Sequence, residues 1–295
     1  MIPTLGANLT TPPPVLAEEV ALDLMRAHWG LTGVLDPLTS ERDLNYRVTT
    51  TQGRYVLKLA NPAEPTAVTQ FQTQALLHLE TTALPVPRVV RTTAGATDVQ
   101  TPHGTLRLLT YLEGQPLHLA PKSMAQRASI EQSAARLSLG LQGFSDPASR
   151  QDLQWDIRHA ARLRPLLPDI AADLRLLCAQ TLDIFEQTVL PHLPNCRWQV
   201  VHNDLNPHNV LVDAENPDRI AGVLDFGDMV RTPLVCDLGV AASYQVDPSA
   251  ALDSLVDFTA AYHRVLPLTP LELSLVPDLT ATRMLTTICI TSWRA

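Results

Sequence analysis

The amino-acid sequence predicts an α+β chain in which a strand-rich part precedes a mainly helical part. Short runs of strand type, separated by turn residues, occupy much of residues 34–112. From residue 121 on, apolar side chains recur instead at the spacing of amphipathic helices. The length of 295 residues is sufficient for two domains, or for one large bilobed domain with a substantial core.

The composition makes some classes of function less plausible. The net charge of −8 argues against a protein that binds nucleic acid by electrostatic attraction. It slightly favours a cationic substrate, or it only keeps the chain soluble. The N-terminus has no basic region followed by an apolar run, and no apolar stretch approaches ~18 residues. We therefore expect a cytoplasmic protein that binds neither nucleic acid nor a membrane.

The cysteines carry no recognisable metal-binding pattern, because they lie far apart in the sequence. We expect buried structural thiols in a reducing compartment. The four residues are Cys178, Cys196, Cys236 and Cys289.

The strand-rich part is expected to follow a loose arm at residues 1–14, which ends in three prolines. Helical spacing predicts a first helix, with Gly30 as its C-cap. The turn Gln52-Gly53 joins two strand-type runs into a β-hairpin. The expected elements are a helix at 15–29, a hairpin with strands at 45–50 and 54–60, a helix at 67–80, an extended segment at 84–90, and a second hairpin with strands at 97–100 and 106–109.

The helical part is interrupted by a polar segment with short apolar runs. The expected helices span residues 123–143, 156–167, 168–193, 235–244, 250–266 and 269–293. Pro191 and Pro194 are expected to end the long third helix. The apolar runs between the helices, at 198–201, 210–212 and 220–224, are of strand type.

Two motifs in this segment, V-V-H-N-D-L-N-P-H-N and L-D-F-G-D, carry side chains with evident chemistry. In phosphoryl transfer a protein has to hold metal ions on phosphates, align an acceptor hydroxyl and take its proton. Asp204, at the head of the first loop, can accept that proton. Asn209 and Asp225 supply the oxygen ligands that Mg²⁺ prefers. The plainer interpretation is that these residues only cap tight turns.

Together the motifs resemble the aminoglycoside phosphotransferase and choline kinase family, small-molecule relatives of the protein kinases. The resemblance covers nearly the whole chain from residue 34 on and implies a bilobed, protein-kinase-like α+β fold. Residues 1–112 would form a nucleotide-binding lobe, with a small antiparallel sheet and one main helix. Residues 113–295 would form a larger, mainly helical lobe with the catalytic hairpins and the substrate site.

The same resemblance implies an enzyme that transfers a phosphoryl group to an alcohol. Asp204 would be the catalytic base, and Asn209 and Asp225 would bind Mg²⁺. The donor would be ATP or GTP, a choice that depends on backbone geometry and that the sequence leaves open.

Lys58 lies inside an apolar strand, where a period of two places it on one face and Leu57 and Leu59 on the other. A lysine in such a strand is costly unless its ammonium group meets an anion. The resemblance supplies the anion, since Lys58 matches the lysine that contacts the α- and β-phosphates of the nucleotide. The alternative is a lysine that extends to solvent at a sheet edge.

The resemblance also implies a glutamate on the next helix that pairs with this lysine, but the matching position is Gln72. Its amide can accept a hydrogen bond from Lys58 but carries no charge. Glu64 and Glu80 are the nearest alternative anions. The departure indicates either a subgroup or weaker nucleotide binding. It keeps open a second class of function, a non-catalytic nucleotide-binding module.

Two further nucleotide contacts are implied by the resemblance. The loop from Leu38 to Asn45 stands where kinases cover the phosphates, but it contains no glycine, so Ser40 and Asn45 would take that role. The Thr110 carbonyl and the Leu112 amide match the hinge that contacts the base. An ordinary polar turn and an ordinary strand end would look the same in sequence.

The remaining candidates lie around the two motifs. Asp228 is expected to contact a second metal ion or the substrate, or to cap its turn. His202 is expected to shape the loop, and His208 either faces the substrate or is exposed to solvent. By the resemblance, Asp237 accepts backbone N–H groups of the catalytic loop. Arg231 could bind a substrate carboxylate.

Within the family, segments such as D-L-N-Y-R-V and Y-V-L-K-L-A-N-P look most like the hydroxylysine kinase branch. This implies a small cationic or zwitterionic acceptor with a side-chain hydroxyl. Homoserine, a choline-like amine or an aminoglycoside remain alternatives. Bacterial members of this branch are sometimes fused ahead of a class III aminotransferase. Since the sequence stops within an apolar helix, we expect a C-terminal fused domain.

Overall fold

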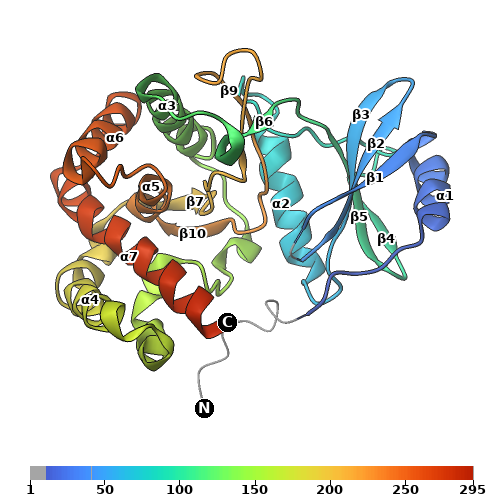
Figure 1. The fold of residues 1–295 in the computed structure, drawn as a ribbon. Helices are drawn as coiled ribbons and strands as arrows, with labels where there is room; N and C mark the ends of the chain where they lie inside the picture. Colours follow the sequence, from blue (N-terminus) through green and yellow to red (C-terminus); the bar gives the residue numbers. More distant parts are fainter. Residues whose placement is uncertain (1–10, 41, 295) are drawn as a thin grey trace. The chain divides into compact units, whose positions relative to one another are not determined.

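The computed structural model describes residues 11–40 and 42–294, and the chain divides into two compact units between Glu113 and Gly114. Within these residues, the N-terminal unit contains a five-stranded sheet and two α-helices, and the C-terminal unit contains five α-helices and two small sheets (Figure 1). This architecture confirms the predicted α+β class. Most of the arm predicted at residues 1–14 lies outside the described residues.

The sheet of the N-terminal unit is antiparallel, with strand order β1-β2-β3-β5-β4. Its strands are β1 (Val34–Leu38), β2 (Leu44–Thr50), β3 (Gly53–Leu59), β4 (Val99–Thr101) and β5 (Gly104–Thr110). Helices α1 (Glu18–Trp29) and α2 (Thr66–Leu79) lie on opposite sides of this sheet (Figure 1). Both predicted hairpins are present. The predicted helix at 67–80 is confirmed as α2, and the one predicted at 15–29 begins three residues later than expected.

The period of two in β3 gives the sheet an apolar face and a charged face. Leu57 and Leu59 belong to a buried cluster with Met25 of α1. Lys58 projects from the other face, and its partner across the ladder on β5 is Arg107. Helix α2 therefore covers a sheet face that carries two adjacent cations.

Helix α5 (Leu234–Ser243) is the most deeply buried helix of the C-terminal unit, and residues 234–242 are all buried. Helices α3 (Met124–Gly140), α6 (Ala251–Val265) and α7 (Pro270–Arg294) pack against it, and α4 (Ala172–Ile184) packs against α7 (Figure 1). One small sheet pairs β7 (Trp198–Val201) with β10 (Val230–Pro233). The other has the order β6 (Gln115–Pro116), β8 (Val210–Val212) and β9 (Ile220–Val223).

Two predicted helices are not continuous α-helices in the structure, and proline accounts for the first. Residues 156–167 were expected to be α-helical, but Ile157–Asp169 forms consecutive 3₁₀ turns that contain Pro165 and Pro168. Each proline lacks the N–H that an α-helix needs. The long helix expected at 168–193 is only α4, followed by a π turn at Phe185–Val189 and a 3₁₀ turn at Leu190–Asn195. Strand β10 was not predicted.

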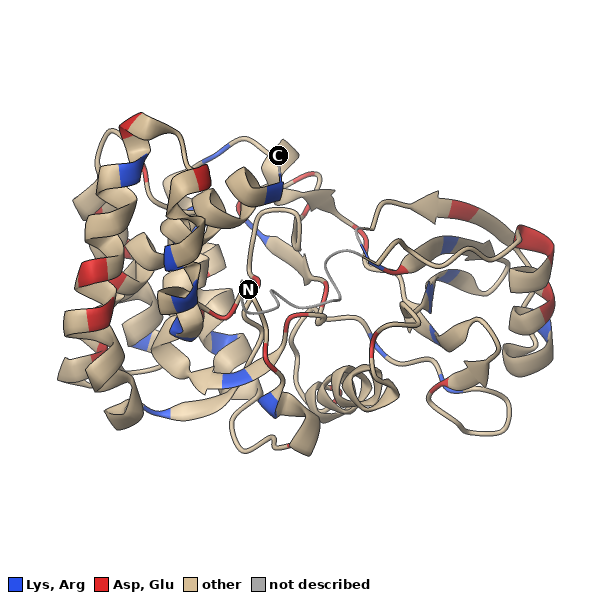
Figure 2. Cartoon of the chain, turned by 90° about the horizontal axis from the view of Figure 1, so that it is seen from below, with Lys and Arg blue, Asp and Glu red and all other residues tan. Residues whose placement is uncertain are grey.

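The expectations drawn from cysteine spacing, hydropathy and charge can be compared with the structure. All four cysteines are buried and unpaired, as expected. Among the described residues, no helix is sufficiently long and apolar to span a bilayer. Charges of both signs are interspersed in each unit (Figure 2).

Helix α3 buries a carboxyl group whose ionisation opposes folding. Glu131 is only 2% exposed. Burial raises the pKa of Glu131 to about 7; Asp257 adds to this shift, whereas Arg127 and Arg264 oppose it. Because the folded-state pKa lies above the ordinary value, the proton bound by this group favours the folded state. That contribution is complete below about pH 4.5 and is lost as the pH rises through about 7.

We therefore expect Glu131→Gln to stabilise the protein at pH 8, by up to about 2 to 3 kcal/mol, since the amide has no charge to bury. At pH 5 the variant and the wild type should unfold at nearly the same temperature. Thermal unfolding at both pH values tests this, and Glu80→Gln, on an exposed glutamate, is the matched control. An equal effect of Glu131→Gln at the two pH values would contradict the assignment.

Candidate active site

His202 ties the loop after β7 to the turn after β9. Its ring is fully buried, with Nε2 2.9 Å from the Leu224 carbonyl oxygen and Nδ1 3.3 Å from the backbone nitrogen of Asp204. A carbonyl can only accept and a backbone N–H can only donate, so the network assigns the neutral Nε2–H tautomer. The ring also meets Phe226 edge-on, with centroids 5.0 Å apart. His202 thus acts in this structure as a link within the loop.

Asn203 turns the chain so that the next side chain leaves the loop. Its φ is +64°, in the left-handed region that asparagine tolerates better than most residues. Its backbone N–H donates to Asp237 Oδ1 on α5 over 2.7 Å. Burial raises the pKa of Asp237, and the hydrogen bond from the Asn203 N–H opposes that rise. Helix α5 therefore supplies a buried acceptor that holds the strained turn.

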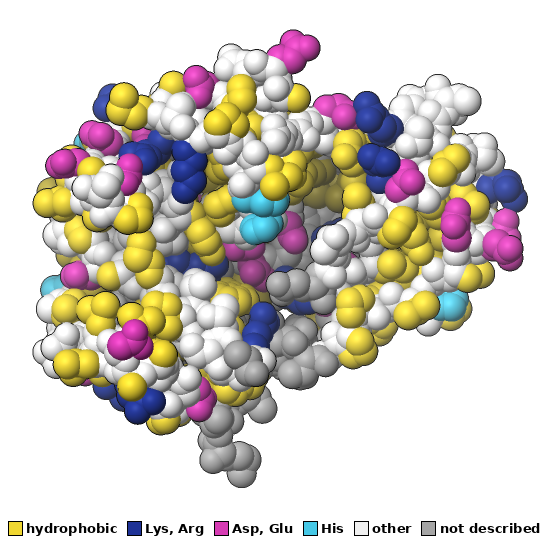
Figure 3. Space-filling view, viewed as in Figure 1, with side chains coloured by type: hydrophobic (Ala, Val, Ile, Leu, Met, Phe, Trp, Pro, Cys, Tyr) yellow, Lys and Arg dark blue, Asp and Glu magenta, His cyan; other side chains and the backbone are white. Residues whose placement is uncertain are grey.

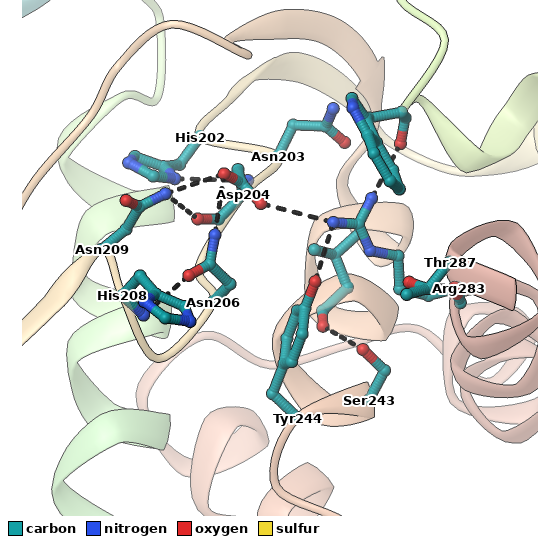
Figure 4. A network of polar contacts seen from close by, with 12 residues as sticks. His202, Asn203, Asp204, Asn206, His208, Asn209, Ser243, Tyr244, Arg283 and Thr287 are labelled. Carbon is teal, nitrogen blue, oxygen red and sulfur yellow. Dashed lines mark hydrogen bonds and ion pairs between the residues drawn. The ribbon is translucent and has the colours of Figure 1, made fainter. Parts of the chain in front are cut away.

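Asp204 extends from this turn into a set of donors (Figure 4). Its Oδ2 accepts hydrogen bonds from Asn206 Nδ2 over 2.9 Å and from Asn209 Nδ2 over 2.7 Å. Its Oδ1 lies 3.3 Å from Nη2 of Arg283, which comes from α7. The Asp204 side chain is 19% exposed. Donors from two separate segments of the chain thus hold both oxygens of this carboxylate.

The charge on Asp204 is balanced between opposing effects. Burial, followed by the negative charge of Asp228, raises the pKa of Asp204 to about 6, and Asp225 adds to this. Arg283 and the hydrogen bond from Asn206 lower it. At neutral pH the group is therefore mostly ionised, yet its pKa is near enough to the working pH to favour proton transfer in both directions.

The amide of Asn209 has a defined orientation. Its Nδ2 donates to the backbone carbonyl of Asp204 over 3.0 Å as well as to Oδ2 of the same residue. Both amide hydrogens are thereby directed at Asp204, so the side-chain oxygen points the other way. The backbone carbonyl of Asn209 accepts from the Leu224 N–H over 2.7 Å, which joins this position to the end of β9.

Asp225 directly follows that junction. It has a φ of +53°, and its Oδ1 accepts the Gly227 N–H over 3.0 Å. The oxygens of Asn209 and Asp225 suit a hard cation such as Mg²⁺, which takes one or two protein ligands and completes its shell with phosphates and water. In residues 11–40 and 42–294 no cluster of three His, Cys, Asp or Glu side chains could form a metal cage by itself. Asn209 and Asp225 are therefore the residues of this loop and turn that could hold a metal ion.

The other predicted residues of this unit lie at different depths. Asp228 is nearly buried, and its charge acts on Asp204. The backbone N–H of His208 donates to Asn206 Oδ1 over 2.7 Å, and its ring stacks on His118 with centroids 4.0 Å apart. Figure 3 shows histidine side chains on the surface. Arg231 stacks on Trp198, which lies beside it on β7.

In the N-terminal unit, Lys58 meets an anion within the chain. Its Nζ lies 3.1 Å from Asp43 Oδ2, and both side chains are 13% exposed. Asn45 is its partner across the ladder on β2. A lysine within an apolar strand needs an anion close to its ammonium group, and Asp43, from the loop between β1 and β2, supplies one.

Gln72 of α2 lies between two charges of opposite sign. Its Oε1 accepts from Arg107 Nη2 over 3.0 Å, and its Nε2 donates to Glu64 Oε1 over 3.2 Å. Burial and Asp43 raise the pKa of Glu64, whereas Arg107 and Lys58 are among the cations that lower it. A glutamate at position 72 could accept from Arg107 but could not donate to Glu64. The amide is therefore matched to its neighbours.

The last predicted nucleotide contacts have local roles in the structure. Ser40 Oγ accepts the Asp43 N–H over 3.2 Å and so shapes the loop that carries the partner of Lys58. Thr110 Oγ accepts the Arg88 N–H over 2.9 Å at the end of β5. Leu112 follows two residues later, just before the boundary between the units.

The chain as a whole can be compared with known proteins. The model of the phosphotransferase enzyme family matches residues 34–268. The chain belongs to the phosphotransferase enzyme family. This phosphotransferase is 27% identical over 290 residues to hydroxylysine kinase from Mus musculus, covering 88% of this chain and 77% of that one. It is 31% identical over 247 residues to homoserine kinase from Methylobacillus flagellatus, covering 81% and 72%.

Solved structures share the fold. A microcompartment-associated aminopropanol kinase matches with a TM-score of 0.72 at 20% identity, covering 90% of this chain and 86% of that one. An amicoumacin kinase in complex with AMP-PNP and Ca²⁺ matches with a TM-score of 0.73 at 15% identity, covering 95% and 87%. Family and relatives together make this phosphotransferase a small-molecule kinase, with a nucleotide as phosphoryl donor and a hydroxyl group as acceptor.

Sequence reasoning missed two arginines of this phosphotransferase. Arg107 is 2% exposed within an apolar strand, and the argument that singled out Lys58 applies to it equally. Arg283 is 3% exposed in an apolar helix. A lone cation on an otherwise apolar face was the available signal for both, although it does not reveal which anion the cation meets.

Removing the acceptor on α5 should loosen the turn at Asn203 that precedes Asp204. Asp237→Ala leaves the buried Asn203 N–H without its partner, so we expect a loss of about 1 to 3 kcal/mol in the free energy of unfolding. Denaturant unfolding measures this loss. Asp237→Asn, which keeps an oxygen acceptor, should lose less. A fully stable Asp237→Ala protein would show that this bond does not hold the turn.

Proposed function

We propose that this phosphotransferase transfers the γ-phosphoryl group of ATP or GTP to a hydroxyl group of an amino acid or amine-bearing metabolite. The favoured acceptor is of the hydroxylysine type, with homoserine next. The observation that carries the proposal is the Asp204 carboxylate, mostly ionised at neutral pH and held on both oxygens beside the outward-facing oxygen of Asn209.

In this proposal Asp204 accepts the proton of the acceptor hydroxyl. A carboxylate oxygen can accept about two hydrogen bonds. Oδ2 already accepts from Asn206 and Asn209, whereas within residues 11–40 and 42–294 Oδ1 has one bond, from Arg283. The acceptor hydroxyl would therefore donate to Oδ1. The base holds the hydroxyl in line with the phosphorus and takes its proton as the new O–P bond forms and the bond from the γ-phosphorus to the leaving nucleoside diphosphate breaks.

Asn209 and Asp225 would hold Mg²⁺ in this proposal. The ion would neutralise charge on the phosphates during transfer, which is usually a large electrostatic contribution. Lys58, in the nucleotide-binding lobe up to residue 112, would contact the phosphates of the donor. Ser40, Asn45, Thr110 and Leu112 are the further proposed nucleotide contacts, and Gln72 supports them through its bonds to Glu64 and Arg107.

The preference for an amine-bearing acceptor rests on charge and on the relatives. The negative charges of Asp225 and Asp228 both act on Asp204. An ammonium group on the acceptor would be attracted to them. Hydroxylysine and homoserine, the acceptors in the names of two relatives, are both amino acids with a side-chain hydroxyl. Choline-like amines and aminoglycosides share the amine and the hydroxyl but lack the carboxylate.

A panel of acceptors tests the proposal. Hydroxylysine, homoserine, choline, 1-amino-2-propanol and an aminoglycoside are supplied with Mg·ATP or Mg·GTP, and release of the diphosphate is followed by a coupled assay. We expect the highest kcat/KM for one of the two amino acids. Turnover of choline or the aminoglycoside alone would contradict the favoured amino-acid acceptor.

The same assay tests the base. Asp204→Asn should lower kcat by about 100-fold or more, because general base catalysis contributes on that scale. Its thermal shift with Mg-nucleotide should remain, since Asp204 is not a proposed metal ligand. Asp253→Asn, an exposed aspartate on α6, is the matched control and should keep full activity. An active Asp204→Asn enzyme would exclude Asp204 as the base.

A further inference from the structure

Arg283 is a buried cation placed directly against the proposed base. Its guanidinium Nη2 lies 3.3 Å from Asp204 Oδ1 and donates to the Tyr244 hydroxyl over 2.9 Å, while Nη1 donates to the Trp155 carbonyl over 3.2 Å (Figure 4). The group also lies 4.9 Å from the centroid of the Trp155 ring and 5.7 Å from that of Tyr244. With 3% exposure, this arginine is held from several sides and is poorly placed to swing outward.

The position of Arg283 is set by the packing of α7 on α5. Gly239 of α5 faces Leu279 of α7 so closely that an added Cβ would lie 2.9 Å from the Leu279 Cβ. Arg283 follows Leu279 by four residues and therefore lies one turn further along the same face. The close Gly239–Leu279 contact thus helps to fix the position of α7 along α5 and its rotation about its own axis, and with them the place of the Arg283 guanidinium.

This contribution comes from outside the region that defines the family. The family model ends at residue 268, and α7 begins at Pro270. The motif residues Asn206 and Asn209 bind one oxygen of Asp204, and α7 binds the other. The family signature therefore accounts for only part of what holds the base.

The division of the two oxygens has a mechanical consequence. The terminal torsion of an aspartate is broad, and the two hydrogen bonds to Oδ2 restrain the carboxylate at one of its oxygens only. A third, charge-assisted bond to the other oxygen fixes the plane. It is Oδ1, the oxygen that Arg283 holds, that has room for the acceptor hydroxyl.

We infer that Arg283 is a positioning residue, which helix α7 brings to Asp204 to fix the plane of its carboxylate so that Oδ1 faces the acceptor hydroxyl. The inference rests on the proposed role of Asp204 as base. It assigns a function in the reaction to the helix after the family region. Tyr244 and Trp155 keep the guanidinium in place, from the end of α5 and from the segment before the 3₁₀ turns.

A different role for Arg283 would give different kinetics. If the guanidinium served to bind a carboxylate of the acceptor, its removal would raise the KM for the acceptor and leave kcat nearly unchanged. If it positions Asp204, its removal lowers kcat, while the KM for nucleotide stays the same. The split between kcat and KM therefore distinguishes the two roles.

The experiment compares Arg283→Met, Arg283→Lys and Arg283→Ala with the control Arg294→Met. Arg294 is an exposed arginine at the end of α7 that stacks on the same Trp155 ring, with 5.8 Å between the guanidinium carbon and the ring centroid. We expect Arg283→Met to lower kcat at least tenfold, with the nucleotide KM within threefold of the wild type. Arg283→Lys should recover part of the loss, and added guanidinium should partly restore Arg283→Ala. Arg294→Met should keep kcat within twofold.

A crystal structure of Arg283→Met gives a readout that needs no turnover. The inference predicts a rotated Asp204 carboxylate, or one in two orientations. An unchanged carboxylate, a kcat within threefold of the wild type, or a change confined to the acceptor KM would each overturn it. If Arg283→Met does not fold, Arg283→Lys is read by the same criteria. A wild type that phosphorylates no acceptor contradicts the proposed function, whereas the orientation of Asp204 still decides the role of Arg283.

Discussion

The active site of this phosphotransferase depends on one constraint, which is that a largely buried carboxylate must keep its charge. Burial and two neighbouring carboxylates favour the protonated form of Asp204, and three donors oppose them. Isolated charges in protein interiors are costly, so such a group persists only where donors surround it. The arrangement of the loop after β7, the amide of Asn209 and the helix α7 all follow from this requirement.

The backbone meets the same constraint by two turns in the left-handed region. Asn203 and Asp225 are the two residues other than glycine with positive φ among those the structure describes. Asn203 immediately precedes Asp204, and Asp225 itself carries a carboxylate. In the first turn the Asn203 N–H donates to Asp237 Oδ1, and in the second the Gly227 N–H donates to Asp225 Oδ1. Strained backbone persists only where the surroundings hold it, as the buried Asp237 does here.

The N-terminal unit solves the opposite problem, since it buries cations. Lys58 and Arg107 are neighbours on one sheet face, where their charges repel each other. Asp43 pairs with the first, and Gln72 joins the second to Glu64. Two anions thus compensate for the missing glutamate at position 72: Asp43, from the loop before β2, and Glu64, from the loop between β3 and α2. We regard the amide as part of an altered charge network and not as a sign of a degenerate enzyme.

The sequence predicted what depends on local order. Alternation in β3 identified Lys58, and the spacing of the two motifs identified Asp204, Asn209 and Asp225, because these signals lie within single segments. It failed where a distant contact decides. Arg283 is separated from Asp204 by 79 positions, and nothing in either segment indicates that Gly239 lets α7 approach α5 so closely. The helix expected at 156–167 was wrong because helical spacing of apolar residues was given more weight than Pro165.

We propose that Asn209 directs its amide hydrogens at Asp204 and its oxygen at a metal ion, so that base and metal are separate but adjacent. A crystal structure with Mn²⁺ and a non-hydrolysable nucleotide, with anomalous scattering used to locate the metal, tests it most directly. The account predicts a Mn²⁺ ion coordinated by the side-chain oxygens of Asn209 and Asp225, with Asp204 still bonded to the Asn209 amide and outside the coordination shell. A metal ion bound by Asp204, or nucleotide and metal bound without Asn209 and Asp225, would contradict it.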